Sequence, residues 1–128
     1  MNFRSMPLNV VVLCAVVAIA VMGGSAAGKA VTMKGYVLDS ACAFTKNLDK
    51  PISRDCALAC AKAGSPLVIL TDDGTIYWPI SNTTPATGQN EKLLPFAGQK
   101  VTATGSVFER GGSRALVIDK IEALPAAK

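Results

Sequence analysis

Two glycine-containing turns limit what this chain can fold into more than any other feature of its sequence. Asp72-Asp73-Gly74 and Gly111-Gly112 each lie between stretches rich in β-branched residues. Asp-Gly and Gly-Gly favour the tight turns of β-hairpins, whose central residues adopt positive φ. The sequence therefore predicts two hairpins, made of strands at residues 67–71 and 75–80 and at residues 101–107 and 114–124.

A fifth strand is predicted at residues 30–39, where Val31, Met33 and Val37 alternate with polar residues and Gly35 indicates a bend. In the last strand the apolar phase changes between Ile118 and Ile121. That change predicts a β-bulge or burial of both faces.

Helical stretches are fewer and shorter. Residues 54–63 are rich in alanine and are followed by Gly64 and Pro66, which are typical of a helix end. A weaker helical turn is predicted at residues 90–96. Residues 81–88 contain turn-forming residues without periodicity and are predicted to be a loop.

The order of these elements is that of an all-β, five-stranded OB-fold-like barrel with short helices. A cysteine-containing helical insert would separate strands one and two. An open β-sandwich is the alternative. Residues 28–128 are enough for one domain with one core.

The first 27 residues are predicted to be a cleaved signal peptide. Arg4 precedes an apolar stretch at residues 10–22, and small residues follow at 23–27. The apolar stretch is shorter than the roughly 20 residues of a spanning helix. We therefore expect export to a periplasmic or extracellular location, with no stable membrane insertion after cleavage.

Three cysteines, Cys42, Cys56 and Cys60, remain after cleavage at this site. In an oxidising compartment an odd number of cysteines suggests one disulfide and one further thiol, or a metal site. Cys56 and Cys60 are four residues apart on the predicted helix, too far for a bridge in regular geometry. Cys42, expected in the loop before that helix, could pair with either, and the third cysteine would then be buried among Ala57, Leu58 and Ala61.

Two functional alternatives use the same cysteines. Three converging thiolates could hold Cu(I) or, with a fourth ligand, Zn(II). Cys56 or Cys60 could also attack disulfides, with Cys42 as the resolving thiol. The spacing Cys-x-x-x-Cys differs from the two-residue spacing of thioredoxin-like proteins.

The chain has no histidine, which excludes Ser-His-Asp and Cys-His catalysis and leaves no recognisable catalytic group. Without Arg4 the net charge is about +3, and the basic residues are not clustered, so nucleic acid is not an expected partner.

Tyr77 and Trp78 are adjacent on a strand and face opposite sides. One is expected in the core, and the other could contact a ligand on the barrel face.

The chain resembles a group of small exported bacterial proteins of unknown function with an OB-like fold. The similarity is carried by Asp39-Ser40-Ala41-Cys42, by Cys56-Ala57-Leu58-Ala59-Cys60, and by Gly64 and Pro66. Such relatives often have a histidine shortly before the first helical cysteine, where this chain has Ser53-Arg54-Asp55. The resemblance implies a small exported OB-like domain and no particular activity.

Together these features predict an exported, non-enzymatic binding module stapled by one disulfide, with no cofactor. Its small ligand or protein partner would bind at the mouth of the barrel, near the cysteine insert and residues 81–88. A copper- or zinc-binding protein and a thiol-disulfide exchange protein are the alternatives.

Overall fold

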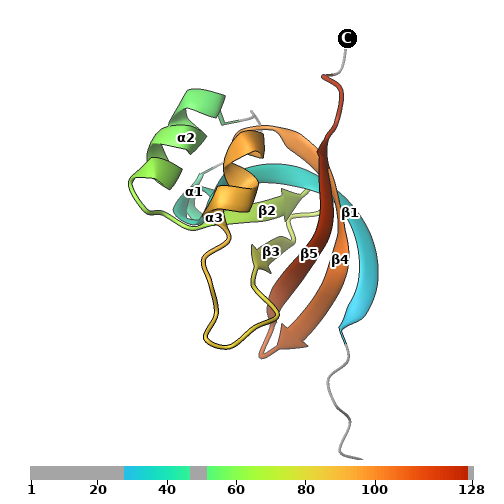
Figure 1. Cartoon of the computed structure of the whole chain (residues 1–128). Coiled ribbons are helices and arrows are strands. Elements are labelled where there is room, and N and C mark those ends of the chain that lie inside the picture. The colour runs from blue at the N-terminus through green and yellow to red at the C-terminus, as the bar shows by residue number, and fades with distance from the viewer. Residues whose placement is uncertain (1–27, 47–51, 127–128) are drawn as a thin grey trace, which may run out of the picture.

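A computed structural model of the chain describes residues 28–46 and 52–126 (Figure 1). Five strands form a closed barrel in the hydrogen-bonded order β1-β2-β3-β5-β4. This confirms the OB-like barrel rather than the open sandwich. The predicted signal peptide, residues 1–27, lies outside the described residues. The strands are β1 (Lys29–Asp39), β2 (Leu67–Thr71), β3 (Ile76–Pro79), β4 (Lys100–Arg110) and β5 (Ser113–Ala123).

The long first strand closes the barrel by pairing on both of its edges. Gly35 is paired with Thr71 of β2 and also with Val101 of β4. A Cβ atom at Gly35 would lie 2.6 Å from the carbonyl oxygen of Leu70, so the close approach of the β2 backbone at this position requires glycine. The remaining seam is a parallel pairing between β3 and β5.

The predicted irregularity in the last strand is a β-bulge. Thr104 of β4 is opposite Lys120, whereas the next residue, Gly105, is opposite Ile118, so Asp119 is the extra residue of β5. The bulge brings the two backbones close together at Gly105. A Cβ atom there would lie 2.0 Å from the carbonyl oxygen of Val117.

Both predicted helices are present, as α2 (Arg54–Lys62) and as α3 (Asn90–Leu93) followed by the 3-10 turn η1 (Leu94–Phe96). A third helix, α1 (Ser40–Thr45), was not predicted, and Cys42 lies on it rather than in a loop. The side chain of Asp39 caps α1, and the helix contacts β1 and β2. Because an isolated helix of six residues is unstable in water, α1 depends on these tertiary contacts.

Helices α2 and α3 lie at the same end of the barrel and complete its core (Figure 1). Ala57 and Ala61 of α2 and Leu93 of α3 join the inward-facing residues of the strands in one cluster. Arg54 ties α2 to η1 by donating hydrogen bonds to the carbonyl oxygens of Pro95 and Ala97, each at 3.1 Å. The helical insert is therefore packed onto the barrel.

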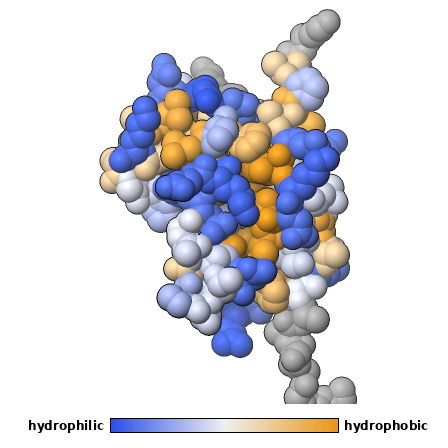
Figure 2. Space-filling model, in the orientation of Figure 1, coloured by the Kyte–Doolittle hydropathy of each residue, from blue (hydrophilic) through white to orange (hydrophobic). Residues whose placement is uncertain are grey.

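The molecular surface carries mostly hydrophilic side chains on the face that Figure 2 shows. A narrow apolar strip lies between α3 and β5. Within residues 28–46 and 52–126, no helix has the length and apolar character needed to span a membrane.

Replacing Gly105 tests the geometry of the bulge. Gly105→Ala should lower the free energy of unfolding by about 1–3 kcal/mol, because the new methyl group would overlap the backbone of Val117. Gly88→Ala is the matched control, since a Cβ atom at Gly88 would meet nothing within 4 Å. Urea unfolding of the two variants measures the difference, and equal stabilities would contradict the close approach.

Candidate functional site

The carboxylate of Asp39 contacts both ends of the helical insert that connects β1 to β2. Asp39 is the last residue of β1 and is 4 % exposed. One carboxylate oxygen accepts a hydrogen bond from the backbone N–H of Cys42, at 2.8 Å, and the other accepts one from the hydroxyl of Ser65. The backbone N–H of Ser40 also donates to the carbonyl oxygen of Pro66, at 2.9 Å. The beginning and the end of the insert therefore meet at Asp39.

These hydrogen bonds decide the charge state of Asp39. Burial by itself would raise the pKa of this carboxyl group, because it disfavours the charged form. The hydrogen bonds from Ser65 and from the backbone at Cys42 stabilise the carboxylate and outweigh burial. The pKa of Asp39 is therefore lowered below its usual value, and the residue is charged at neutral pH.

The three cysteines lie on the two helices of the insert. All three are free thiols, and the predicted disulfide is not formed in this structure. Cys42 on α1 and Cys60 on α2 are half-buried, whereas Cys56 is exposed. The expected burial of an unpaired cysteine in the core is not observed, because Ala57 and Ala61 occupy the inward-facing positions of α2. Cys56 and Cys60 lie one turn apart on α2, as their spacing predicted.

The surroundings of Cys42 and Cys60 favour the protonated thiol. Burial raises the pKa of Cys42, and the hydrogen bond and negative charge of Asp39 raise it further. Burial, followed by the charge of Asp39, also raises the pKa of Cys60. Thiolates are the nucleophiles in disulfide exchange and the ligands in metal sites. Neither residue is therefore an activated nucleophile of the kind that a catalyst of disulfide exchange requires, although slow oxidation to a disulfide remains open to both.

The metal alternative receives no geometric support from the described part of the chain. Within residues 28–46 and 52–126, no three His, Cys, Asp or Glu side chains lie in an arrangement that could hold a metal ion. A Cu(I) or Zn(II) site at Cys42, Cys56 and Cys60 would require these side chains to move closer together.

Helix α1 lies across the outer face of the sheet. Leu38 of β1 and Val68 of β2 are buried, yet neither belongs to the core inside the barrel. Their neighbours Val37 and Ile69 point into that core, so Leu38 and Val68 face outward. Because α1 contacts both strands, we conclude that it covers these outward-facing side chains.

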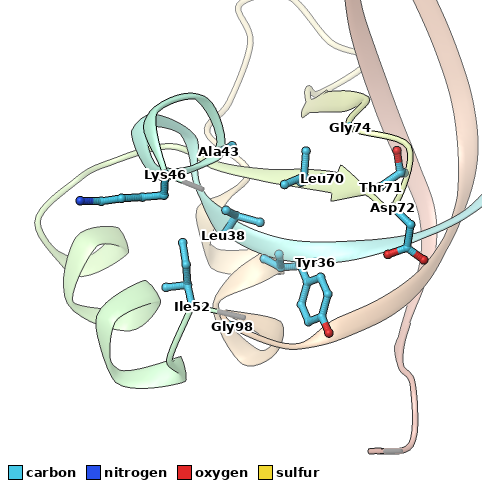
Figure 3. A pocket seen from close by; sticks show the side chains of 11 residues that line it. Tyr36, Leu38, Ala43, Lys46, Ile52, Leu70, Thr71, Asp72, Gly74 and Gly98 are labelled. Carbon is cyan, nitrogen blue, oxygen red and sulfur yellow. The ribbon is translucent and has the colours of Figure 1, made fainter. Parts of the chain in front are cut away.

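On one side of α1 the covered face opens into a cavity of about 330 Å³, which we call the α1 cavity. Leu38, Leu70 and Ala43 form its apolar wall. Figure 3 shows Tyr36 and Asp72 at one end and Lys46 at the other, with the amino group of Lys46 directed away from them. The cavity is therefore apolar inside and polar at one end.

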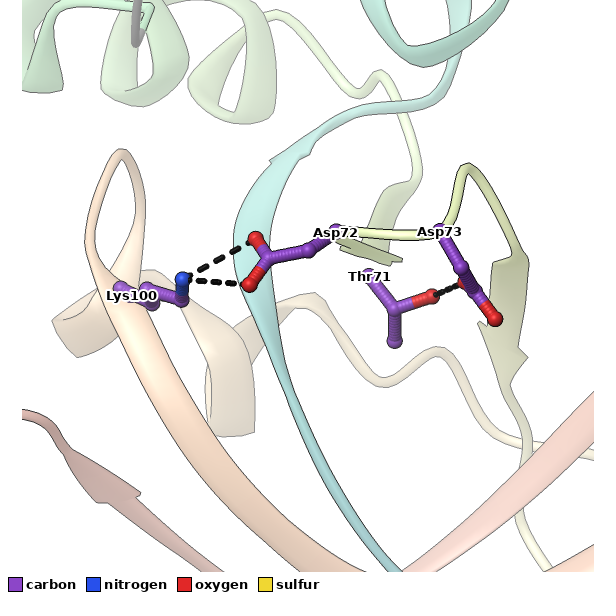
Figure 4. Close-up of polar contacts among 4 residues, drawn as sticks. All are labelled: Thr71, Asp72, Asp73 and Lys100. Atoms are coloured by element: carbon purple, nitrogen blue, oxygen red, sulfur yellow. Dashed lines mark hydrogen bonds and ion pairs between the residues drawn. The ribbon is translucent and has the colours of Figure 1, made fainter.

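An ion pair lies beside the polar end of the α1 cavity. Nζ of Lys100 is 2.7 Å and 3.0 Å from the two carboxylate oxygens of Asp72 (Figure 4). The same nitrogen is 5.6 Å from the centre of the Tyr36 ring. The hydrogen bond with Asp72 raises the pKa of Lys100. Because the side chain of Asp72 is 70 % exposed, the pair contributes little to stability.

A second and larger hollow contains Trp78. It has a volume of about 740 Å³ and runs between the end of the insert, at Gly64 and Pro66, and the loop at residues 81–88. We call it the Trp78 groove. The ring of Phe44 from α1 lies 6.2 Å from that of Trp78, at an interplanar angle of 33°, and Phe44 is 66 % exposed. An accessible aromatic surface thus borders the groove.

The polar side chains along the Trp78 groove are held by local hydrogen bonds. The amide of Asn90 accepts from the N–H of Leu67, at 2.9 Å, and donates to the carbonyl oxygen of Ser65, at 2.7 Å. The hydroxyl of Ser81 accepts from the N–H of Thr87, at 3.0 Å. The groove is therefore preformed, with fixed walls on both sides.

The adjacent residues Tyr77 and Trp78 point to opposite faces of the sheet, as expected from the sequence. Tyr77 packs against the core, and Trp78 lies on the opposite face, in the groove. Sequence reasoning missed Asp39 as a cap and Phe44 as the partner of Trp78. Asp39 carried a signal, because Asp followed by Ser is typical of a helix N-terminus. Phe44 carried none, since its partner is far away in the sequence.

The acid dependence of stability tests the role of Asp39. Its pKa is lower in the folded protein than in the unfolded chain, so its stabilising contribution is present above about pH 4 and is lost as the pH falls through the folded value. Asp39→Asn should lower the free energy of unfolding by about 1–3 kcal/mol at pH 7. The difference from wild type, measured by urea unfolding, should shrink toward pH 3. A difference that stays constant with pH would contradict a charged Asp39.

Ser65→Ala is the companion variant for this measurement. It removes the hydroxyl donor and leaves the backbone of the insert unchanged. Since Ser65 lowers the pKa of Asp39, this variant should lose part of the same acid dependence. Combining both substitutions should cost less than the sum of the single losses.

The function of this site has to be argued from its geometry. The resemblance to small exported bacterial proteins with an OB-like fold remains an expectation from the sequence. No family model, no curated protein sequence and no solved structure matches this chain.

Proposed function

We propose that this protein is an exported, non-enzymatic binding module whose ligand stacks on Trp78 in the Trp78 groove. The observation that carries the proposal is the position of this side chain. Trp78 is half-buried on the outer face of the barrel, in a preformed groove, beside the exposed ring of Phe44. Large aromatic side chains that remain accessible in a concave site are typical of binding surfaces.

The place of the groove in the fold supports this proposal. OB-fold barrels bind ligands on the face of strands two and three and at the adjoining loops. Trp78 lies on β3, and the insert between β1 and β2 borders the same groove. A volume of about 740 Å³ is within the range of small-molecule and short oligomer sites.

Binding fits the chemistry of the chain better than catalysis does. The chain contains no histidine to act as a base. The raised pKa values of Cys42 and Cys60 leave both as weak nucleophiles at neutral pH. Asp39, the buried carboxylate near them, is occupied by two hydrogen bonds to the insert.

The proposal keeps the export and the single disulfide predicted from the sequence. An exported domain of this size gains stability from a covalent link. The thiols beside Asp39 supply the sulfur atoms for such a link.

Tryptophan fluorescence tests the proposal directly, because Trp78 is the one tryptophan of the chain. We expect at least one compound among short oligosaccharides and short peptides to shift or quench its emission in a saturable way. Trp78→Ala should weaken that binding, measured by calorimetry, by about 2 kcal/mol, or roughly thirtyfold in Kd. Trp78→Phe should retain most of the affinity, since the phenyl ring can still stack.

Tyr36→Ala is the matched control, because it removes an aromatic side chain from the α1 cavity and leaves the groove intact. Its affinity should equal that of the wild type. The reverse pattern, with Tyr36→Ala weakened and Trp78→Ala unchanged, would move the ligand to the α1 cavity. A screen in which no compound changes the emission would leave the binding module without support.

A further inference from the structure

The positions of the cysteines along the insert distinguish between the two possible disulfides. Asp39 accepts a hydrogen bond from the N–H of Cys42, at 2.8 Å, and one from the hydroxyl of Ser65. The N–H of Ser65 in turn donates to the carbonyl oxygen of Cys60, at 3.1 Å. A short chain of hydrogen bonds therefore links the backbone of Cys42 to that of Cys60.

Cys56 lies farther from this junction. Helix α2 ends at Lys62, so Cys60 is in its last turn, next to the pairing of Asp39 with Leu67 at the base of the insert. Cys56 is one turn earlier, about 6 Å away along the helix axis. It is exposed, whereas Cys42 and Cys60 are both half-buried.

The causes of the raised pKa values also place Cys60 nearer than Cys56 to Cys42. Among the cysteines, Cys60 raises the pKa of Cys42 more than Cys56 does. Asp39 raises the pKa of both Cys42 and Cys60, so both thiols lie close to the same carboxylate. The charge of Cys56 and a hydrogen bond with it also raise the pKa of Cys60, so these two thiols are neighbours on α2. A direct bridge between Cys56 and Cys60 is nevertheless disfavoured by their spacing on one regular helix.

Cys42 also occupies a particular side of α1. Cys42 and Phe44 are two residues apart, or about 200° around the helix axis, so they point to opposite sides. Phe44 lies beside Trp78 of β3. A bond from Cys42 would therefore fix the side of α1 opposite to the one that contacts Trp78.

We propose that Cys42 and Cys60 form the disulfide of this protein and that the bond, by restricting α1, keeps Phe44 beside Trp78. Only the second part, which concerns the Trp78 groove, rests on the proposed binding function. In the reaction each of the two thiols loses a proton and the S–S bond forms. The two electrons pass to an incoming disulfide oxidant, whose own S–S bond breaks to give two thiols. Cys56 remains an exposed thiol.

Peptide mapping tests the connectivity without any ligand. The protein is purified from an oxidising compartment, alkylated without reduction and digested with trypsin. Cleavage after Lys34, Lys46, Arg54 and Lys62 gives one peptide with Cys42, residues 35–46, and one with both Cys56 and Cys60, residues 55–62. We expect these two peptides to be linked, with the alkyl group on Cys56.

Variants confirm the assignment. Cys56→Ser should keep the linked peptide, and Cys60→Ser should lose the link between Cys42 and Cys60. Because none of the three cysteines belongs to the hydrophobic core, loss of the bond should leave a folded protein. A bond between Cys42 and Cys56, with Cys60 alkylated, would overturn the proposal. Three alkylated cysteines would overturn it as well.

Quenching of Trp78 fluorescence by acrylamide tests the second part. In Cys56→Ser, reduction of the disulfide should raise the quenching constant roughly twofold, because α1 then moves more freely and uncovers the indole. In Cys42→Ser the reductant should change nothing. Phe44→Ala should raise quenching in the oxidised protein. Unchanged quenching on reduction would overturn the role of the bond at the groove and leave the connectivity standing, whatever the ligand screen finds.

Discussion

The arrangement of this protein depends on one buried carboxylate. Asp39 is the last residue of β1, and its side chain caps α1 by accepting a hydrogen bond from the N–H of Cys42. It also accepts a hydrogen bond from the hydroxyl of Ser65, which lies just before β2. A buried charge is costly unless hydrogen bonds stabilise it, and here both carboxylate oxygens have donors. These contacts close the insert at its base, where the chain leaves β1 and where it returns to β2.

The position of the insert determines which surfaces the barrel offers. In an OB-fold the outer face of the second and third strands is open to ligands. In this chain α1 covers part of that face and buries Leu38 and Val68. What remains is the α1 cavity on one side and the Trp78 groove on the other. The insert thus reshapes the common binding face of the fold and adds Phe44 to it.

The sequence predicted the barrel well because its signals are local. The turn glycines Gly74, Gly111 and Gly112 adopt positive φ, as the hairpin prediction requires. The change of apolar phase after Ile118 marked the bulge at Asp119. Each of these features depends on neighbouring residues, so alternation and turn composition were enough to find them.

The site was less predictable because its contacts join distant residues. Ser65 reaches Asp39, Lys100 reaches Asp72, and Phe44 lies beside Trp78, and no local pattern encodes any of these pairs. Helix α1 is too short for a periodic signal and depends on packing against the sheet. Trp78 could be proposed as a ligand residue from its strand position, but its groove needed the packed loop at residues 81–88.

Amide hydrogen exchange on the wild type and on Asp39→Asn tests most directly whether Asp39 holds the insert on the barrel. If it does, the amides of α1 and of the last turn of α2 should exchange at least about tenfold faster in the variant, while those of β4 and β5 keep their protection. Equal exchange in both proteins, or an equal loss of protection in the insert and in the barrel, would contradict this account.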